Sequence, residues 1–312
     1  MQKTSSIVVV LGTGGTIAGT AADAGDHLGY TAAQLGVDAL LRSVPALAKL
    51  PIESEQVAQI DSKDMEFAVW RRLAERVAQH LSRPEVGGIV ITHGTDTLEE
   101  TAYLLQRVLA PAKPVVLTAA MRPATSLQAD GPQNLLDAVH VACHPGAHGV
   151  LAVLAGAVHG AVDVRKVHTY RIDAFSSGDA GPLAYVEAGR LRVLRAWPRG
   201  DAVGVARLAR AVWPRVDIVL SCAGADGTAV DALAASGARG LVVAGTGNGS
   251  LHHSLEAALL RARDGGVRVL RCSRVAAGPV FAKPDEQLTA GGELSPVQAR
   301  VELLLQLLAE PG

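Results

Sequence analysis

Residues 7–16 have the sequence IVVVLGTGGT, in which five aliphatic residues run directly into a turn of glycine and threonine. A short aliphatic run of this kind indicates a buried strand, and the glycines indicate a tight turn at its end. Similar runs recur at Val86–Thr92, Pro114–Thr118 and Gly149–Leu154. Strands that are apolar on both faces predict a sheet that is covered on both sides.

Helical patterns separate these predicted strands. Residues 64–81 place apolar side chains at helical spacing, and further helices are expected at 95–109 and 131–143. Alternation of strands and helices predicts an α/β fold with a mostly parallel, doubly wound sheet.

The pattern changes after about residue 185, where arginines and two Trp-Pro pairs interrupt the alternation. We therefore predict a larger N-terminal catalytic α/β domain at 1–190, a linker at 191–214 and a smaller C-terminal α/β domain at 215–312. The smaller domain is expected to contain strands at 217–221, 240–244 and 267–272, and helices at 228–235, at 250–263 and after Ser295.

Composition argues against several classes of protein. The chain has 312 residues and a formal charge of −1, and aromatic residues make up only 3%. Neither a basic stripe nor aromatic side chains for base stacking are present, so no nucleic-acid partner is expected. No apolar run reaches the length of a membrane span, so no membrane association is expected. Three distant cysteines and a first segment unlike a signal peptide favour the cytoplasm.

The candidate site residues follow the predicted strands, because ligands of such sheets bind at the carboxyl ends of the strands. Thr13 lies in the first turn, which fits a structural turn, a nucleotide loop or a catalytic loop. A nucleotide-binding loop would have a third glycine or a following Gly-Lys-Ser/Thr, and this turn has neither. Thr95 and Asp96 follow the second strand, where they could cap a helix or face a ligand.

Three charged residues in later loops have two interpretations each. Arg122 and Asp130 could form a structural ion pair or belong to the site. Lys166 could be a solvated charge, or a base if it is desolvated. Two hydroxyl groups with an aspartate and a lysine are a plausible set for acyl transfer. Since no Gly-x-Ser-x-Gly or His-Glu-x-x-His pattern occurs, we expect no serine triad and no metal or organic cofactor.

The segments TGGTI at 13–17 and HGTDT at 93–97 resemble the two signatures of bacterial-type L-asparaginases. The resemblance extends nearly end to end and is closer to the type II branch. It includes the segments 59–65, 120–123, 130–132, 181–183, 245–249 and 273–275.

This resemblance implies hydrolysis of the side-chain amide of L-asparagine to L-aspartate and ammonia. It assigns Thr13 as the nucleophile that forms an acyl-enzyme, and Tyr30 as the residue that activates it. It also implies a second triad of Thr95, Asp96 and Lys166. Backbone N–H groups at 94–96 are well placed to stabilise the oxyanion.

The resemblance further implies a substrate-binding set. Ser62 and Asp96 match the residues that hold the α-carboxylate and α-ammonium groups, and Ala120 belongs to the same set. The family forms homotetramers, as dimers of dimers with sites at subunit contacts. Asn248 matches a residue lent by the neighbouring chain, and we expect no use for it within its own subunit.

Two departures from the family pattern stand out. Lys63 occupies a position where the family usually has Gln or Glu, and we expect it to turn toward a carboxylate such as Asp61 or Asp64. Residues 276–292 form a shorter segment than in type II enzymes. Asp285 and Glu286 are the candidates there for a carboxylate that reaches a neighbouring site.

Other functions remain open on the sequence. A glutaminase-asparaginase, or an amidohydrolase with another amide substrate, would share every catalytic residue, because one methylene changes binding by only about 1–3 kcal/mol. A non-catalytic α/β protein that binds an amino acid or a nucleotide is the alternative of a different class. Release of ammonia from asparagine distinguishes the two.

Overall fold

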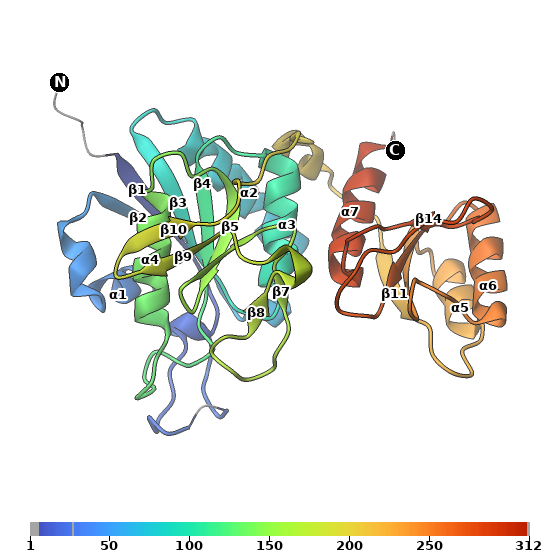
Figure 1. The fold of residues 1–312 in the computed structure, drawn as a ribbon, viewed down its shortest axis with the longest axis horizontal. Coiled ribbons are helices and arrows are strands. Elements are labelled where there is room, and N and C mark those ends of the chain that lie inside the picture. Colours follow the sequence, from blue (N-terminus) through green and yellow to red (C-terminus); the bar gives the residue numbers. More distant parts are fainter. Residues whose placement is uncertain (1–5, 27, 311–312) are drawn as a thin grey trace. The chain divides into compact units, whose positions relative to one another are not determined.

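The computed structural model describes residues 6–26 and 28–310, which divide into two compact units after Val205 (Figure 1). The first unit is built on an eight-stranded sheet with the order β10-β9-β6-β5-β4-β3-β1-β2. Its strands are β1 (Ile7–Gly14), β2 (Ile52–Ile60), β3 (Val86–Thr92), β4 (Pro114–Thr118), β5 (Gly149–Leu154), β6 (Ala157–Gly160), β9 (Ala184–Glu187) and β10 (Arg190–Val193).

The five strands from β2 to β5 in this order are parallel, and β6, β9 and β10 extend the sheet in antiparallel pairs. The helices are α1 (Val37–Arg42), α2 (Phe67–Leu81), α3 (Leu98–Leu109) and α4 (Gly131–Ala142). A separate two-stranded sheet pairs β7 (Arg165–Lys166) with β8 (Phe175–Ser176). The predicted doubly wound, mostly parallel sheet is confirmed.

The side chains of β1 alternate between the two faces of the sheet. Val8 and Val10 belong to one core cluster together with residues of α1 and α4. Trp70 of α2 is hydrogen-bonded to Thr101 of α3, and neither helix contributes to that cluster. The helices α2 and α3 therefore cover the other face, as Figure 1 shows.

The placement of α4 has a topological consequence. β3, β4 and β5 are consecutive parallel neighbours, and the connecting helices α3 and α4 lie on opposite faces. The two crossovers therefore have opposite hands, and one of them departs from the right-handed rule. Residues 119–130 connect β4 to α4, so the loop that contains Arg122 and Asp130 begins at the carboxyl end of β4.

The second unit has a four-stranded parallel sheet with the order β11-β12-β13-β14. Its core joins α5 and α6 to one face, and α7 packs against β11, β12 and β13 (Figure 1). Ser295 caps the start of α7 as predicted, and Gln298 completes a capping box with it. The elements are β11 (Val216–Leu220), α5 (Thr228–Ala235), β12 (Gly240–Gly245), α6 (His253–Asp264), β13 (Arg268–Ser273), β14 (Thr289–Ala290) and α7 (Pro296–Ala309).

The structure differs from the sequence-based expectations mainly at element ends. The helix expected from residue 64 begins at Phe67, because Ser62–Asp64 form a 3-10 turn first. The helix expected from residue 95 begins at Leu98, which leaves residues 93–97 as a loop. The first residues of the predicted linker, 191–193, belong to β10 and pair with β9.

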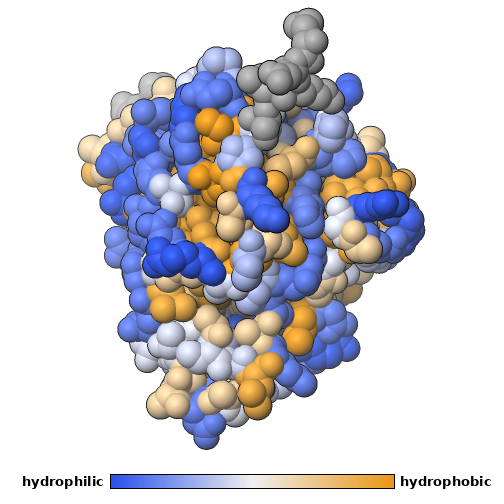
Figure 2. All heavy atoms as spheres, turned by 90° about the vertical axis from the view of Figure 1, so that its left-hand side faces the viewer, coloured by the Kyte–Doolittle hydropathy of each residue, from blue (hydrophilic) through white to orange (hydrophobic). Residues whose placement is uncertain are grey.

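Hydrophobic and hydrophilic side chains both lie on the surface of the protein. Figure 2 shows hydrophobic side chains gathered between hydrophilic ones on one face. Within the described part of the chain, no helix combines the length and the apolar character that a membrane span requires.

Candidate active site

The carboxyl ends of β1 and β3 bring the two signature segments together. The strands are parallel neighbours, with Gly12 opposite Thr92. The Thr13 side chain is 2% exposed, and its Oγ1 donates a hydrogen bond of 2.9 Å to the carbonyl oxygen of Thr92. The first threonine thus lies directly against the strand that leads into the second signature.

Backbone contact between two glycines holds these segments together. Gly15 has φ of +81°, and a Cβ at this position would collide with the backbone of Gly94. A Cβ at Gly94 would in turn collide with the side chain of Ser62. Glycine tolerates both the left-handed conformation and the close approach, so it is required here for steric reasons.

The predicted cluster of Thr95, Asp96 and Lys166 is present in the structure. Lys166 Nζ donates hydrogen bonds to Thr95 Oγ1 at 2.9 Å and to Asp96 Oδ1 at 2.6 Å. Lys166 lies on β7, some 70 residues from Asp96 along the chain. The ammonium is mostly buried and the carboxylate is half exposed. The bonded hydroxyl, carboxylate and ammonium groups can therefore pass a proton through Thr95.

Ser62 connects the 3-10 turn after β2 to the second signature. Its Oγ accepts a hydrogen bond of 3.2 Å from the backbone N–H of Asp96, and its carbonyl oxygen accepts one of 2.8 Å from Thr97 Oγ1. The expected substrate-binding pair of Ser62 and Asp96 is thus adjacent. The N–H of Asp96, expected as an oxyanion donor, has Ser62 as its partner in this conformation.

A buried histidine fixes the second signature from inside, and the sequence-based reasoning assigned it no role. His93 Nδ1 lies 2.8 Å from the Gly94 carbonyl oxygen, and its Nε2 lies 3.0 Å from Thr101 Oγ1. Trp70 Nε1 donates to the same hydroxyl oxygen at 2.8 Å. Nδ1 therefore carries the proton, and Nε2 accepts one from Thr101. Burial lowers the pKa of His93 to about 4, so the ring is neutral near pH 7.

Tyr30 lies near the first signature, but its hydroxyl has a partner other than Thr13. The Tyr30 hydroxyl and Thr16 Oγ1 are 2.8 Å apart. The segment that carries Tyr30 is held by a bridge between Thr20 and Thr31. In this conformation the acceptor of the Thr13 proton is the Thr92 carbonyl, and Tyr30 is bonded to the neighbouring threonine of the same turn.

The loop between β4 and α4 is braced by backbone contacts. Ala120 is fully buried in this conformation. Asp130 accepts hydrogen bonds of 3.0 Å from the N–H groups of Met121 and Arg122. The Arg122 guanidinium donates to the Tyr170 carbonyl oxygen at 2.9 Å and lies 4.0 Å from the centre of its ring. Arg122 and Asp130 therefore shape this loop.

The Lys63 side chain pairs with a carboxylate of its own 3-10 turn, as expected. Its Nζ lies 2.8 Å from Asp61 Oδ2, and its side chain is 64% exposed. The hydrogen bond to Asp61 is the main reason that the pKa of Lys63 is raised. The ammonium is thus held in a solvated ion pair outside the buried part of the site.

Asn248 has a role within its own chain, contrary to the expectation from the sequence. Its Nδ2 donates to the Phe281 carbonyl oxygen at 3.1 Å, and its Oδ1 accepts from the Phe281 N–H at 2.8 Å. Glu286 pairs with the buried Arg271. Both polar groups brace the loop that follows β13, while Asp285 in that loop is exposed.

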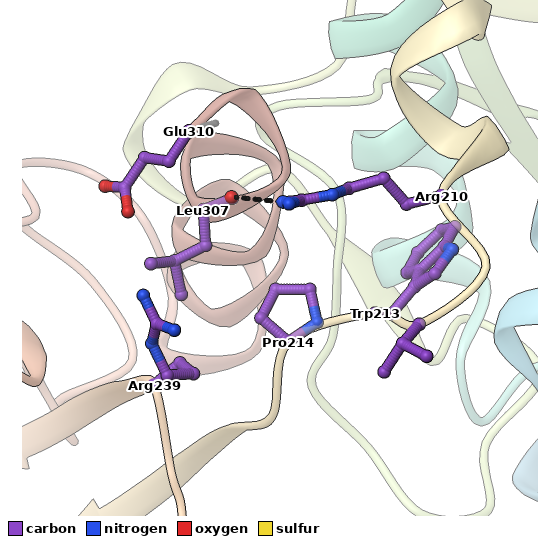
Figure 3. A pocket seen from close by; sticks show the side chains of 7 residues that line it. Arg210, Trp213, Pro214, Arg239, Leu307 and Glu310 are labelled. Carbon is purple, nitrogen blue, oxygen red and sulfur yellow. Dashed lines mark hydrogen bonds between the residues drawn. The ribbon is translucent and has the colours of Figure 1, made fainter. Parts of the chain in front are cut away.

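Two cavities lie away from the cluster of Thr95, Asp96 and Lys166. A cavity of about 330 Å³ in the second unit lies beside the end of α7, where Arg210 donates to the Leu307 carbonyl oxygen (Figure 3). A cavity of about 440 Å³ in the first unit includes His159, whose Nδ1 lies 2.8 Å from Ser177 Oγ. Burial lowers the pKa of His159 to about 4. Neither cavity includes a residue that either signature contributes.

Comparison with known sequences agrees with this arrangement. A family profile described as "Asparaginase, N-terminal" matches residues 7–199, and one described as "Glutaminase/Asparaginase C-terminal domain" matches residues 215–310. The chain is 39% identical to L-asparaginase 2 of Escherichia coli, over 96% of this chain and 88% of that protein. It is 37% identical to a glutaminase-asparaginase of Pseudomonas fluorescens, over 96% and 86%.

A solved structure is similar over nearly the whole chain. The crystal structure of a probable cytoplasmic L-asparaginase from Campylobacter jejuni has a TM-score of 0.93 and 39% sequence identity, and the match covers 98% of this chain and 96% of that one. Two glycine–threonine turns at adjacent strand ends, with a lysine bonded to the second, thus occur in a chain that matches the asparaginase profiles on both units. This protein belongs to the asparaginase family.

Proposed function

We propose that this protein hydrolyses the side-chain amide of L-asparagine to L-aspartate and ammonia through an acyl-enzyme on Thr13. The observation that carries the proposal is the bonded cluster of Lys166, Thr95 and Asp96 beside the strand end that holds Thr13. Family membership supports it, as do relatives that are named L-asparaginase.

The reaction has two steps, and their atoms balance. Thr13 Oγ1 attacks the amide carbon, the C–N bond breaks, and the hydroxyl proton leaves with the amide nitrogen as ammonia. A water molecule then attacks the ester, its oxygen stays on aspartate, and a proton returns to Thr13. We assign Tyr30 to receive the Thr13 proton in the first step and pass a proton to the leaving nitrogen, and Lys166 and Asp96 to hold Thr95 as the group that passes the proton of the attacking water in the second step.

The first step requires a change in the conformation described above. The Thr13 proton faces the Thr92 carbonyl, and the Tyr30 hydroxyl is bonded to Thr16. A carbonyl oxygen cannot accept the proton as a base. We therefore propose that substrate binding moves the Tyr30 segment, so that its hydroxyl leaves Thr16 and faces Thr13.

Replacing either threonine with alanine should abolish turnover. Thr13→Ala and Thr95→Ala should each lower kcat by several orders of magnitude, because a covalent nucleophile or its proton path is lost. Ammonia release from asparagine measures this. Thr118→Ala is the matched control, since Thr118 is also a buried strand-end threonine that donates to a neighbouring carbonyl, that of Val153. A Thr13→Ala enzyme with more than about 10% of wild-type kcat would refute the nucleophile.

The choice between asparagine and glutamine rests on small differences. Relatives of comparable identity are named L-asparaginase and glutaminase-asparaginase. One methylene contributes only about 1–3 kcal/mol to discrimination. We propose asparagine as the main substrate and glutamine as a weaker one. A non-catalytic protein that binds an amino acid would release ammonia from neither.

Lys63 should have little influence on substrate binding. An ammonium about 4 Å from the substrate ammonium would cost roughly 4 kcal/mol at an effective dielectric constant of about 20. The pairing with Asp61 in solvent avoids this repulsion. We therefore expect Lys63→Gln to change KM for asparagine by less than about tenfold and to leave kcat nearly unchanged in steady-state assays. A hundredfold fall in KM would mean that Lys63 faces the substrate.

We propose that the protein assembles as a homotetramer, a dimer of dimers. Large hydrophobic side chains are exposed in both units, among them Leu127 at 87% and Phe281 at 68%. Apolar side chains that lie together on a surface typically mark a subunit contact. Sedimentation of the active enzyme should therefore give a mass near four times 32.2 kDa. A fully active monomer would contradict the assembly.

We infer a cytoplasmic location. The similar Campylobacter protein is described as cytoplasmic, whereas a relative from Haemophilus influenzae is named periplasmic. The three cysteines all lie in the described part of the chain and form no disulfide there, which fits a reducing compartment. Release of the protein by osmotic shock, together with a periplasmic marker, would contradict this location.

A further inference from the structure

We propose that Arg122 is a positioning residue for Lys166, and that it acts by holding the hairpin of residues 165–176, which carries the lysine. The proposal rests on the proposed function, in which Lys166 acts through Thr95. It gives a role to a buried guanidinium group that the reaction does not otherwise use.

The hairpin is attached to the loops that follow two neighbouring strands. The Lys166 ammonium donates to Thr95 and Asp96 in the loop after β3. Farther along the hairpin, the Tyr170 carbonyl oxygen accepts a hydrogen bond of 2.9 Å from the Arg122 guanidinium, in the loop after β4. Because β3 and β4 are parallel neighbours, both attachments lie at the same edge of the sheet.

The backbone of Arg122 is itself held in place. Its N–H donates to Asp130 Oδ1 at 3.0 Å, and Asp130 Oδ2 accepts a hydrogen bond of 3.2 Å from the Asn134 side chain on α4. Arg122 is 8% exposed, whereas Tyr170 is 43% exposed. The buried guanidinium therefore supports the exposed part of the hairpin from the inside.

The guanidinium contacts Tyr170 in two ways. Besides the hydrogen bond to the carbonyl oxygen, its central carbon lies 4.0 Å from the centre of the tyrosine ring. Attraction between a cation and an aromatic face is stronger where water is excluded. A planar guanidinium can stack on a ring and donate hydrogen bonds in its own plane, whereas a lysine ammonium is a compact point charge. The two contacts together therefore favour arginine over lysine at this position.

Pairing within the hairpin is short. β7 and β8 pair over two residues each, and the N–H groups of Val167 and His168 both donate to the Ala174 carbonyl oxygen, at 2.8 and 3.3 Å. A two-stranded ribbon is only marginally stable by itself. Without Arg122 the hairpin would move more freely, and a displacement of about 1 Å at a catalytic group can lower the rate about a hundredfold.

Replacing Arg122 should lower turnover more than it changes substrate binding. Arg122→Ala should lower kcat for asparagine at least tenfold with KM changed less than threefold, because the Lys166 ammonium is no longer held at one position. Arg122→Lys keeps the charge and should give a kcat between those of Arg122→Ala and wild type. Ammonia release measures both. A kcat of Arg122→Ala within twofold of wild type, or a loss that lies wholly in KM, would overturn the proposal.

A second substitution tests whether the effect passes through Lys166. In a Lys166→Met enzyme, adding Arg122→Ala should lower the residual kcat by less than twofold, because no ammonium is left to position. If Arg122→Ala lowers kcat by the same factor with and without Lys166, Arg122 acts by another route and the proposal fails.

Arg300→Ala is the matched control. Arg300 is also a partly buried arginine that donates to a backbone carbonyl oxygen, that of Val216 at 3.0 Å, within the second unit. Its replacement should leave kcat within twofold of wild type. An equal loss of kcat in Arg300→Ala would mean that the loss in Arg122→Ala reflects general stability, and would refute a positioning role.

Amide hydrogen exchange tests the contact without any activity. The Val167 amide lies next to Lys166 and should exchange at least tenfold faster in Arg122→Ala than in wild type, and at the wild-type rate in Arg300→Ala. If wild type releases no ammonia from asparagine, the proposed function fails, while this exchange difference still decides whether Arg122 holds the hairpin. Equal exchange in wild type and Arg122→Ala would show that it does not.

Discussion

The close contact between the turns that follow β1 and β3 is the constraint on which the site depends. Gly15 lies against the backbone of Gly94, and Gly94 lies against Ser62. Any side chain at either glycine would separate the segments. Because the strands are parallel neighbours, their turns emerge at the same edge of the sheet. The contact therefore converts two short motifs, some 80 residues apart, into one cluster of hydroxyl groups.

A buried network sets the orientation of the second turn from behind. The chain of hydrogen bonds from Trp70 through Thr101 to His93 ends on the Gly94 carbonyl, with every donor matched to an acceptor. Burial disfavours the charged form of His93 and lowers its pKa to about 4, so the ring stays neutral in this chain near pH 7. The peptide groups beside Thr95 are therefore positioned by α2 and α3, away from solvent and before any ligand binds.

The two lysines near the site differ in solvent exposure, and their hydrogen-bond partners differ accordingly. Lys166 is mostly buried and has two oxygen partners, whereas Lys63 is largely exposed and needs only Asp61. A buried ammonium without hydrogen-bond partners would be costly in free energy. The Lys166 ammonium is therefore held against Thr95 and Asp96, the oxygen partners that replace water. A solvated lysine is free to turn, which is how this chain accommodates a lysine next to the substrate position proposed from the family.

The sequence by itself determined the strand runs, the order of the elements and the family, because aliphatic runs, helical spacing and paired Gly-Thr turns are local patterns. It also indicated that Thr95, Asp96 and Lys166 would meet, and that Lys63 would turn to a carboxylate. Only the tertiary structure decided the partners of Tyr30, His93 and Asn248, the start of β10 and the opposite hand of the crossover to β5. These features depend on which surfaces pack together, and the energies of such long-range contacts leave no trace in local spacing.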